Sequence, residues 1–276
     1  KYIGDKVRRA EELREEANKL KEEAEEIVGG LINLNTLVNK VNEFTVKNIW
    51  VNSMDIGERV DGQYYTSPIM KINKYMKNDN MDLVSLKEVA KVGKGFTFSS
   101  DKSSEEVPYI RISDLEDLLI DYSSVLKIDN KTYQKKKRSQ LKEYDLIMAI
   151  TGATIGKISV FYNPKIDKAT LSADTAFVRF NNPEDSIIYL IYLKTIIGQL
   201  AIIQGITGAT NKHLAIEDIK NIILPKFEEK TKQIVRDKVI NSIENIYLSK
   251  QLIQEAKQDV EDLIEGNFDM SRLNKT

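Results

Sequence analysis

Apolar residues recur every three or four positions at the N-terminal end of the chain, as they do along one face of an α-helix. They fill two heptad positions, which read Ile3, Ala10, Ala17, Ala24, Leu31 and Lys6, Leu13, Leu20, Ile27, Leu34. Lys6 interrupts this apolar seam, and glutamates fill the outer face. Because alternating alanine and leucine layers let two helices approach closely, the pattern predicts a coiled-coil helix over residues 1–36.

A second helical pattern occupies residues 228–268. Gly266-Asn267 follows its last apolar position and gives a C-cap signal. We expect the two terminal helices to pair antiparallel, within the chain or across a dimer. The expected interface residues are Leu13, Ala17, Leu20, Ala24, Ile27, Val239, Ile246, Ile253 and Val260. A coil that serves dimerisation alone is the alternative interpretation.

The middle of the chain alternates short β-rich runs with Gly, Asp, Asn and Pro, the pattern of strands and turns. The runs are 107–112, 123–128, 146–150, 157–161 and 175–180. The most apolar stretch, 187–203, is too short to span a bilayer comfortably and predicts one buried helix. We therefore expect an α+β protein, with a mixed α/β domain over 82–227 between the coiled-coil helices. Residues 37–81 lead into this domain, and 269–276 form a tail.

Composition narrows the classes of function. The 276 residues include no cysteine and one histidine, His213, which argues against disulfides, metal sites and a Ser-His-Asp triad. The chain has 41 Lys and Arg and 42 Asp and Glu, which gives a net charge of −1. This balance argues against a strongly basic nucleic-acid-binding protein, but a local basic patch can still bind nucleic acid. The lack of a signal-peptide pattern favours a cytoplasmic protein, and the start at Lys1 suggests a trimmed product or a fragment.

The pentapeptide Ile-Thr-Gly-Ala-Thr occurs twice, at 150–154 and 206–210. A lysine follows each copy within three residues, Lys157 after the first and Lys212 after the second. Glycine lets the backbone approach a surface, and threonine hydroxyls, backbone N–H groups and lysines are common DNA contacts. The repeat therefore predicts two DNA-contacting loops, and two tight turns after similar strands are the alternative.

Three further segments have the composition of a DNA surface. The run 131–142 carries six cations without an acid, the turn 93–97 is thin and cationic, and the strand at 108–111 holds Tyr109 and Arg111. A solvated loop is the alternative for the run, and an ion pair with Asp114 is the alternative for Arg111. The candidate DNA contacts are Lys94, Gly95, Thr97, Tyr109, Arg111, Lys135, Lys136, Lys137, Arg138, Thr151, Thr154, Lys157, Thr207, Thr210, Asn211, Lys212 and His213.

Catalytic motifs are absent or defective. The segment 152–157 resembles a phosphate loop, but it has three residues between its glycines where Walker A has four, and Ile158 replaces the Ser or Thr. No G-x-G-x-x-G, H-E-x-x-H or G-x-S-x-G motif occurs. We therefore expect no enzymatic activity and no cofactor or metal bound by this chain.

Several motifs together resemble the target recognition domain of type I restriction–modification specificity (S) subunits. They are Val84-Ser85-Leu86-Lys87-Glu88-Val89-Ala90, Pro108-Tyr109-Ile110-Arg111-Ile112-Ser113-Asp114, Tyr144-Asp145-Leu146-Ile147, Gly152-Ala153-Thr154-Ile155-Gly156-Lys157, Gly208-Ala209-Thr210-Asn211-Lys212-His213-Leu214 and Ile219-Lys220-Asn221-Ile222. Their order and spacing match over about 83–225. The segment 55–65 resembles the approach to such a domain, and the flanking coils resemble the helical spacers of the family.

The resemblance implies a DNA-reading subunit without catalysis of its own. Such a subunit holds methyltransferase subunits, which use S-adenosylmethionine, and through them a restriction subunit that uses ATP and Mg²⁺. The family pattern has two recognition domains, whereas this chain has one, so it resembles a half-subunit that forms a homodimer or the C-terminal half of a longer subunit. A coiled-coil scaffold that binds protein and does not read DNA is the alternative from another class.

Overall fold

The computed structural model describes residues 1–45, 50, 62–98, 106–163, 165–208 and 210–270. The chain divides into two compact units, Lys1–Ile27 with Gln233–Thr276 and Val28–Lys232, and each is treated by itself below. Residues 55–61, which resemble the approach to a recognition domain, lie outside the described part of the chain.

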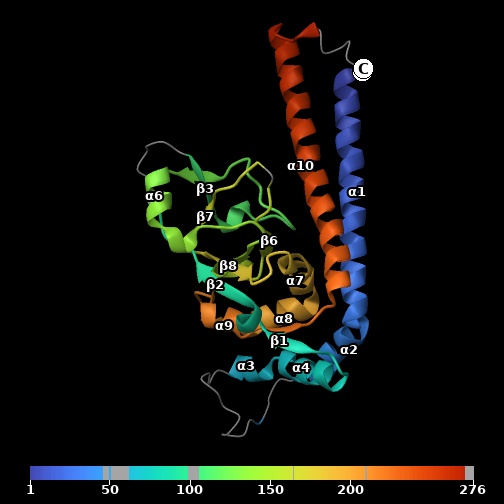
Figure 1. Cartoon of the computed structure of the whole chain (residues 1–276), viewed down its shortest axis with the longest axis vertical. Coiled ribbons are helices and arrows are strands. Elements are labelled where there is room, and N and C mark those ends of the chain that lie inside the picture. The colour runs from blue at the N-terminus through green and yellow to red at the C-terminus, as the bar shows by residue number, and fades with distance from the viewer. Residues whose placement is uncertain (46–49, 51–61, 99–105, 164, 209, 271–276) are drawn as a thin grey trace. The chain divides into compact units, whose positions relative to one another are not determined.

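The first unit is an antiparallel pair formed by α1 (Tyr2–Leu31) and α10 (Glu229–Glu265), which run side by side in Figure 1. Ser242 Oγ donates to the main-chain oxygen of Ala17, and Ser249 Oγ donates to that of Ala10, each at 2.8 Å. All four residues are buried, and small side chains at these positions allow the two backbones to approach closely. The expected antiparallel pairing is confirmed, and it forms within one chain.

Lys6, the residue that interrupts the apolar seam, lies between two acids of α10. Its Nζ is 2.6 Å from the buried carboxylate of Asp259 and 3.3 Å from that of Glu255. Burial by itself would lower the pKa of Lys6, but the hydrogen bonds with Asp259, Tyr2 and Glu255 raise it above its ordinary value. A charged residue is therefore tolerated in the seam because it is paired there.

The other expected interface positions are buried to different degrees. Leu13, Ala17, Ala24 and Val239 are buried, and the list of half-buried positions is Leu20, Ile27, Ile246 and Ile253. The prediction for Val260 is wrong: its side chain is 43% exposed, because Asp259 takes the inward position opposite Lys6.

Helix α10 ends where the sequence predicts. Gly266 has φ +76°, the left-handed conformation of a C-cap glycine. The N–H of Asn267 donates to the carbonyl of Asp262 at 2.8 Å, and that of Gly266 to the carbonyl of Leu263 at 3.3 Å. These bonds satisfy carbonyls that the last helical turn leaves free.

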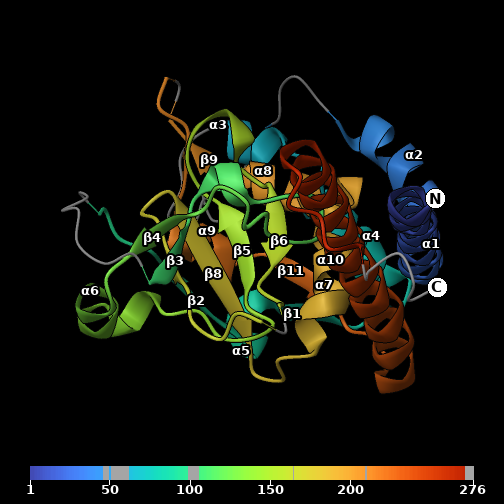
Figure 2. The same ribbon diagram turned by 90° about the horizontal axis from the view of Figure 1, so that it is seen from above.

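The second unit contains the sheets. Within the described residues, β2 (Ala90–Lys94), β8 (Thr175–Phe180), β5 (Leu146–Ala149) and β6 (Ile158–Val160) form an antiparallel sheet in that order. Figure 2 shows these strands side by side. In a second sheet, β3 (Val107–Ile110) lies between the antiparallel β4 (Leu126–Ile128) and the parallel β7 (Thr170–Leu171). Each of the five β-rich runs therefore contributes a strand.

The described part of this unit also contains two strand pairs and several short helices. The pairs are β1 (Leu83–Ser85) with β11 (Ile223–Pro225) and β9 (Ile206–Thr207) with β10 (His213–Leu214). The helices are α2 (Leu34–Phe44), α3 (Gly62–Thr66), α4 (Ile69–Asn78), α5 (Leu86–Val89), α6 (Asn130–Lys135) and α9 (Ile216–Lys220). The α+β class is confirmed. The β1–β11 pair joins the two ends of the domain, which lie more than a hundred residues apart in sequence.

The prediction of one helix over 187–203 is wrong. The segment forms α7 (Asp185–Lys194) and α8 (Ile196–Gln204), which meet at a bend of 85°. Thr195 begins the second helix, because its Oγ1 accepts a hydrogen bond from the N–H of Gly198. A Cβ on Gly198 would lie 2.4 Å from the carbonyl oxygen of Tyr192, so the bend requires glycine there.

No helix in the described part of the chain is by itself long and apolar enough to cross a membrane. The bent pair α7–α8 meets that criterion by length and composition. Its first helix is the core helix of the second unit, with every residue from Ser186 to Leu193 buried.

Candidate nucleic-acid interface

The two Ile-Thr-Gly-Ala-Thr copies lie side by side in the second unit. Thr151 of the first copy forms an antiparallel bridge with His213, which follows the second copy. The N–H of Gly152 donates to the carbonyl of Lys212 at 3.1 Å, and the N–H of Leu214 donates to that of Ile150 at 2.9 Å. Segments 56 residues apart in sequence therefore form one surface.

Both repeated glycines need the conformation that glycine permits. Gly152 has φ +76° and Gly208 has φ +87°, values that L-residues with side chains rarely adopt. The exposed polar residues beside them are Thr154, Lys157, Thr207, Thr210, Asn211 and Lys212, and the hydroxyl of Thr207 donates to the carbonyl of His213 at 3.2 Å. Thr151 and His213 are half-buried, since they form the bridge. The loops are thus both tight turns and accessible surface.

The turn at 172–175, just before β8, connects these loops to the rest of the surface. The carbonyl of Asp174 accepts from the N–H of Ile150 at 3.0 Å, and its Oδ1 accepts from Thr151 Oγ1 at 2.9 Å. On its other side, the carbonyl of Thr175 accepts from the N–H of Gly95 at 3.2 Å. The sequence does not single out this turn, because an Ala-Asp pair before a strand is a common turn signal without distinctive chemistry.

The thin turn predicted at 93–97 packs directly on this connection. A Cβ on Gly95 would lie 2.1 Å and 2.2 Å from the carbonyl oxygens of Leu171 and Ser172. Lys94 and Thr97 are exposed on either side of this glycine. Gly95 therefore allows two backbones to touch, and it holds the two exposed side chains near the repeated loops.

Tyr109 belongs to a small aromatic core. Its side chain is buried, its hydroxyl donates to the carbonyl of Phe96 at 2.5 Å, and its ring contacts those of Phe96 and Phe98. Burial, and to a smaller extent the charge of Asp174, raises the pKa of Tyr109. The structure thus gives Tyr109 a packing role, and we leave it out of the proposed contact surface.

Arg111 forms the ion pair with Asp114 that is the alternative to a DNA contact. Its guanidinium group donates to both carboxylate oxygens of Asp114, at 3.1 and 3.3 Å, and to the carbonyl of Ser124 at 3.4 Å. The carboxylate of Asp114 is buried, whereas the side chain of Arg111 remains 35% exposed. The guanidinium group of Arg111 is thus already engaged within the protein, which makes Arg111 a weak candidate for reading bases.

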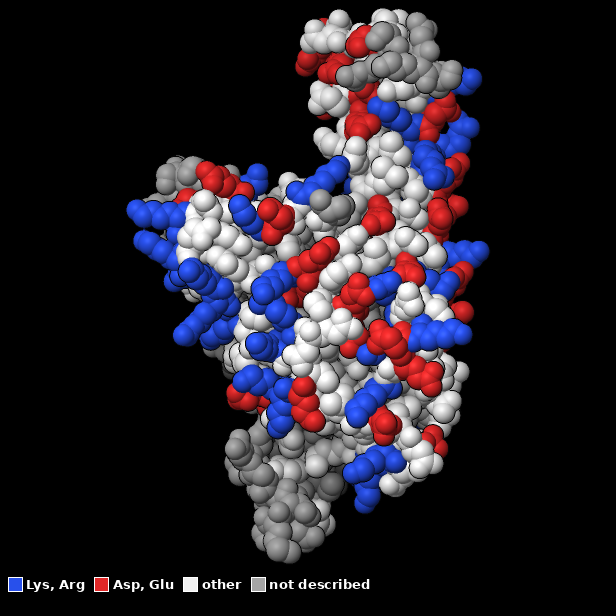
Figure 3. Space-filling model, in the orientation of Figure 1, with Lys and Arg blue, Asp and Glu red and all other residues white. Residues whose placement is uncertain are grey.

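The basic run surrounds α6 and the 3-10 turn that follows it, 137–139. All six of its cations are exposed, and the four that the sequence predicts as contacts are Lys135, Lys136, Lys137 and Arg138. Lys136 Nζ lies 4.9 Å from the centre of the Phe96 ring, which brings the run beside the 93–97 turn. Figure 3 shows Lys and Arg gathered over the flank that α6 occupies in Figure 1.

A buried ion pair anchors the end of this basic segment. Arg179 of β8 donates to both oxygens of Asp145 and to the carbonyl of Gln140, and Asp145 accepts from the N–H of Lys142 at 2.8 Å. Burial raises the pKa of the Asp145 carboxyl group, and the hydrogen bond from Arg179 opposes that shift. The pair fixes the position of the basic run on the sheet.

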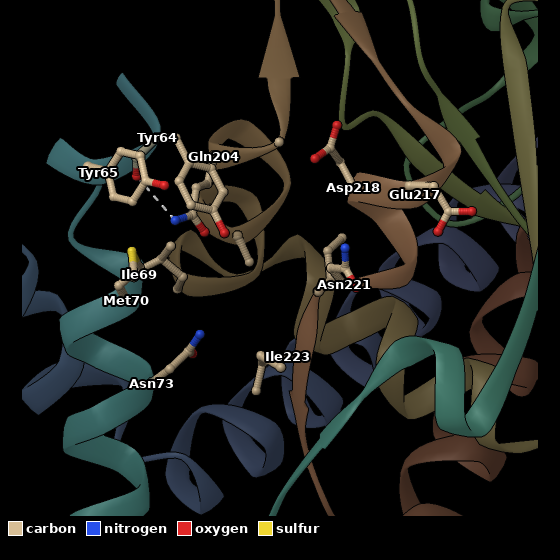
Figure 4. A pocket seen from close by; sticks show the side chains of 13 residues that line it. Tyr64, Tyr65, Ile69, Met70, Asn73, Gln204, Glu217, Asp218, Asn221 and Ile223 are labelled. Carbon is tan, nitrogen blue, oxygen red and sulfur yellow. Dashed lines mark hydrogen bonds between the residues drawn. The ribbon is translucent and has the colours of Figure 1, made fainter. Parts of the chain in front are cut away.

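Among the described residues of this unit, two hollows differ in the charge of their lining. One, of about 380 Å³, has three lysines in its lining, Lys127, Lys165 and Lys168, together with Glu106 and Asp167. The other, of about 430 Å³, lies among α3, α4, α8 and α9, and no Lys or Arg is among its described lining residues. Figure 4 shows Gln204 in this second hollow, where its amide donates to the carbonyl of Tyr64 at 3.2 Å. The second hollow is unsuited to phosphate.

The fold and this surface define a class of protein: an α+β recognition domain that carries a long antiparallel helix pair. The sequence profile of the family described as "Type I restriction modification DNA specificity domain" matches residues 78–258. The match covers more than half of the chain, and the chain belongs to that family. This is a family of DNA-recognition subunits without catalysis of their own, in agreement with the expectation from the sequence.

The fold resembles that of one solved structure with a TM-score above 0.5. An S subunit of a type I restriction–modification system from M. genitalium is 12% identical, with a TM-score of 0.53 over 97% of this chain and 58% of that one. The HsdS subunit from Thermoanaerobacter tengcongensis is 13% identical, with a TM-score of 0.37 over 96% of this chain and 57% of that one. The chain therefore spans less than two thirds of these relatives. None of the curated proteins matches it.

Proposed function

We propose that this chain reads one half of a bipartite DNA target through the second unit. The observation that supports this most directly is the convergence of four segments chosen from sequence for DNA-like chemistry. Backbone hydrogen bonds and a bridge join the two repeated loops to each other, and the 172–175 turn joins them to the 93–97 turn. Lys136 brings the basic run beside that turn. Threonine, asparagine and lysine side chains on the loops suit base edges and phosphates, and the basic run suits phosphates.

The helix pair has a second role in this proposal. It fixes the distance between two half-targets and holds methyltransferase subunits, which use S-adenosylmethionine and connect to a restriction subunit that uses ATP and Mg²⁺. The second recognition domain comes either from another copy of this chain or from the rest of a longer subunit. Exposed apolar residues on α10, such as Leu248 at 44% and Leu263 at 48%, offer a surface for such assembly.

Selection from randomised duplexes tests the central proposal. The full chain would be incubated with a library of random duplex DNA, alone and with methyltransferase subunits, and the retained sequences would be read. Enrichment of one short motif in each half of a split site is the expected result. Retention without any enriched motif, or no retention, would favour the alternative of a protein-binding scaffold.

Replacing Lys135, Lys136 and Lys137 by alanine should weaken binding to all duplexes alike. Each lysine that neutralises a phosphate releases counterions, so the slope of log affinity against log salt should fall by about one for each lost contact. Binding would be measured on target and random duplexes at several salt concentrations. The matched control replaces Lys71, Lys74 and Lys77, three exposed lysines of α4, and should leave affinity and slope unchanged. Equal effects of the two triple variants would contradict the placement of the surface.

Replacing Lys212 or Thr210 by alanine should instead reduce the preference for the target. A lost base contact costs roughly 1 to 3 kcal/mol against the correct sequence and little against random DNA. The measurement is the ratio of dissociation constants on the two duplexes at one salt concentration. A variant that folds normally and keeps both the ratio and the affinity would identify the repeated loop as a structural turn.

A further inference from the structure

Asp174 places an exposed carboxylate at the centre of the proposed DNA surface. Its main-chain carbonyl and its Oδ1 contact the first repeated loop at Ile150 and Thr151. Thr151 in turn bridges to His213 beside the second loop, and the next residue along the chain, Thr175, accepts from Gly95. The carboxylate therefore stands where three of the proposed contact segments meet.

One oxygen of this carboxylate is held and the other is available. Thr151 Oγ1 donates to Oδ1 at 2.9 Å, which fixes the orientation of the side chain. Within the described residues, no hydrogen bond or ion pair engages Oδ2, and the residue is exposed. The orientation is thus set before any ligand arrives, so a ligand that donates to Oδ2 does not bear the cost of ordering this side chain.

A carboxylate at this place repels phosphate. The segments around it carry threonine, asparagine and lysine, which suit the DNA backbone, and an unpaired acid among them would weaken backbone binding. A base edge that presents a hydrogen-bond donor is compatible with the acid. In the major groove these donors are the amino groups of cytosine and adenine, and Asp and Glu pair characteristically with cytosine N4.

We propose that Asp174 is a specificity-determining residue, which accepts a hydrogen bond from the N4 amino group of one cytosine in the major groove of the target. Thr151 is a positioning residue for it, because the Thr151 hydroxyl holds Oδ1 and leaves Oδ2 toward the DNA. The inference rests on the proposed function, since it needs the second unit to read duplex DNA. It adds a residue outside the segments chosen from the sequence, and it states which base the residue reads.

The test compares the full chain with its Asp174→Asn variant in selections from randomised duplexes, with methyltransferase subunits present. Asparagine keeps the shape and an oxygen that accepts from Thr151, but it replaces the second acceptor by a donor. We expect the variant to bind random duplex at least as well, and to lose the preference for cytosine at one position by roughly 5- to 150-fold. The control is Asp79→Asn, at an exposed acid after α4, which should change neither property.

A modified base makes the contact itself measurable. A selected duplex would be prepared with 2-pyrimidinone, which lacks the amino group, in place of that cytosine. The wild-type chain should lose affinity on this duplex by a larger factor than the Asp174→Asn variant loses. An equal loss for both proteins would overturn the proposal.

The remaining outcomes are also informative. A variant that binds every duplex more tightly with an unchanged motif would show that Asp174 only repels phosphate, and a lost preference for adenine would assign a different base; each overturns the proposal. If Asp174→Asn melts at a lower temperature than the wild-type chain, it is compared with Thr151→Val, which removes the hydrogen bond to Oδ1. A cytosine preference that both variants keep overturns the proposal. Failure of the wild-type chain to select any motif would instead contradict the proposed function.

Discussion

Replacing Ala17 by aspartate is expected to separate α1 from α10 and to lower the thermal midpoint of the helix pair. Ala17 has no exposed surface, and its carbonyl accepts from Ser242 Oγ across the pair. A carboxylate has neither room nor a partner between two backbones that approach this closely. An unpaired buried charge costs about 3 to 5 kcal/mol, a large fraction of the about 5 to 15 kcal/mol by which a typical domain is stable.

Circular dichroism during thermal unfolding measures this effect. The control is Asn18→Asp, which adds the same charge at the exposed neighbouring position of the same helix and should leave the midpoint nearly unchanged. The strands of the second unit should keep their signal at temperatures where the Ala17→Asp helices have melted, since the two units are compact separately. Equal midpoints for the two variants would show that the Ala and Leu seam is no interface.

Replacing Gly95 by alanine should destabilise the second unit by about 3 kcal/mol or more and abolish selective DNA binding. The added Cβ would lie 2.1 Å from the carbonyl oxygen of Leu171 and 2.2 Å from that of Ser172. Both are backbone atoms next to Asp174, so they cannot move aside as the end of a side chain can. Relief of the clash has to shift the turn that connects the proposed contact loops.

A graded set of glycine variants tests the steric cause. Gly30→Ala meets no atom within 4 Å and should have little effect, whereas Gly93→Ala meets the Phe177 ring at 2.6 Å, which can rotate or shift. The expected order of destabilisation in denaturant unfolding is Gly30, then Gly93, then Gly95. If Gly95→Ala is no less stable than Gly30→Ala, the close approach at this turn is not needed for the fold.

Local patterns in the sequence were sufficient for the terminal helices and for the strands. The heptad positions of Leu13, Ala17 and Ala24 predict a helix and its buried face, because the period of an α-helix is fixed by the backbone alone. Gly266 predicts the end of α10 for a similarly local reason. The left-handed conformation at a C-cap favours glycine, because glycine has no Cβ. The two repeated glycines likewise predict tight turns, and both have positive φ.

Contacts between distant segments decided the rest. Thr195 and Gly198 bend an apolar stretch that reads as one helix, because the bend packs Gly198 against the backbone of Tyr192. Tyr109 lies in a strand, as the sequence predicts, but its hydroxyl donates to the carbonyl of Phe96. The alternation of residues along a strand cannot predict such a partner.

The candidate site shows the same division between sequence and tertiary structure. The sequence alone determined which loops carry thin, cationic and hydroxyl-bearing residues, since those properties belong to the residues themselves. The bridge between Thr151 and His213, and the position of Asp174 between the loops, exist only because β5, β8 and β10 lie next to one another in space. The free energy of strand pairing depends on residues far apart along the chain, and a pattern within one segment cannot specify which distant segment it will meet.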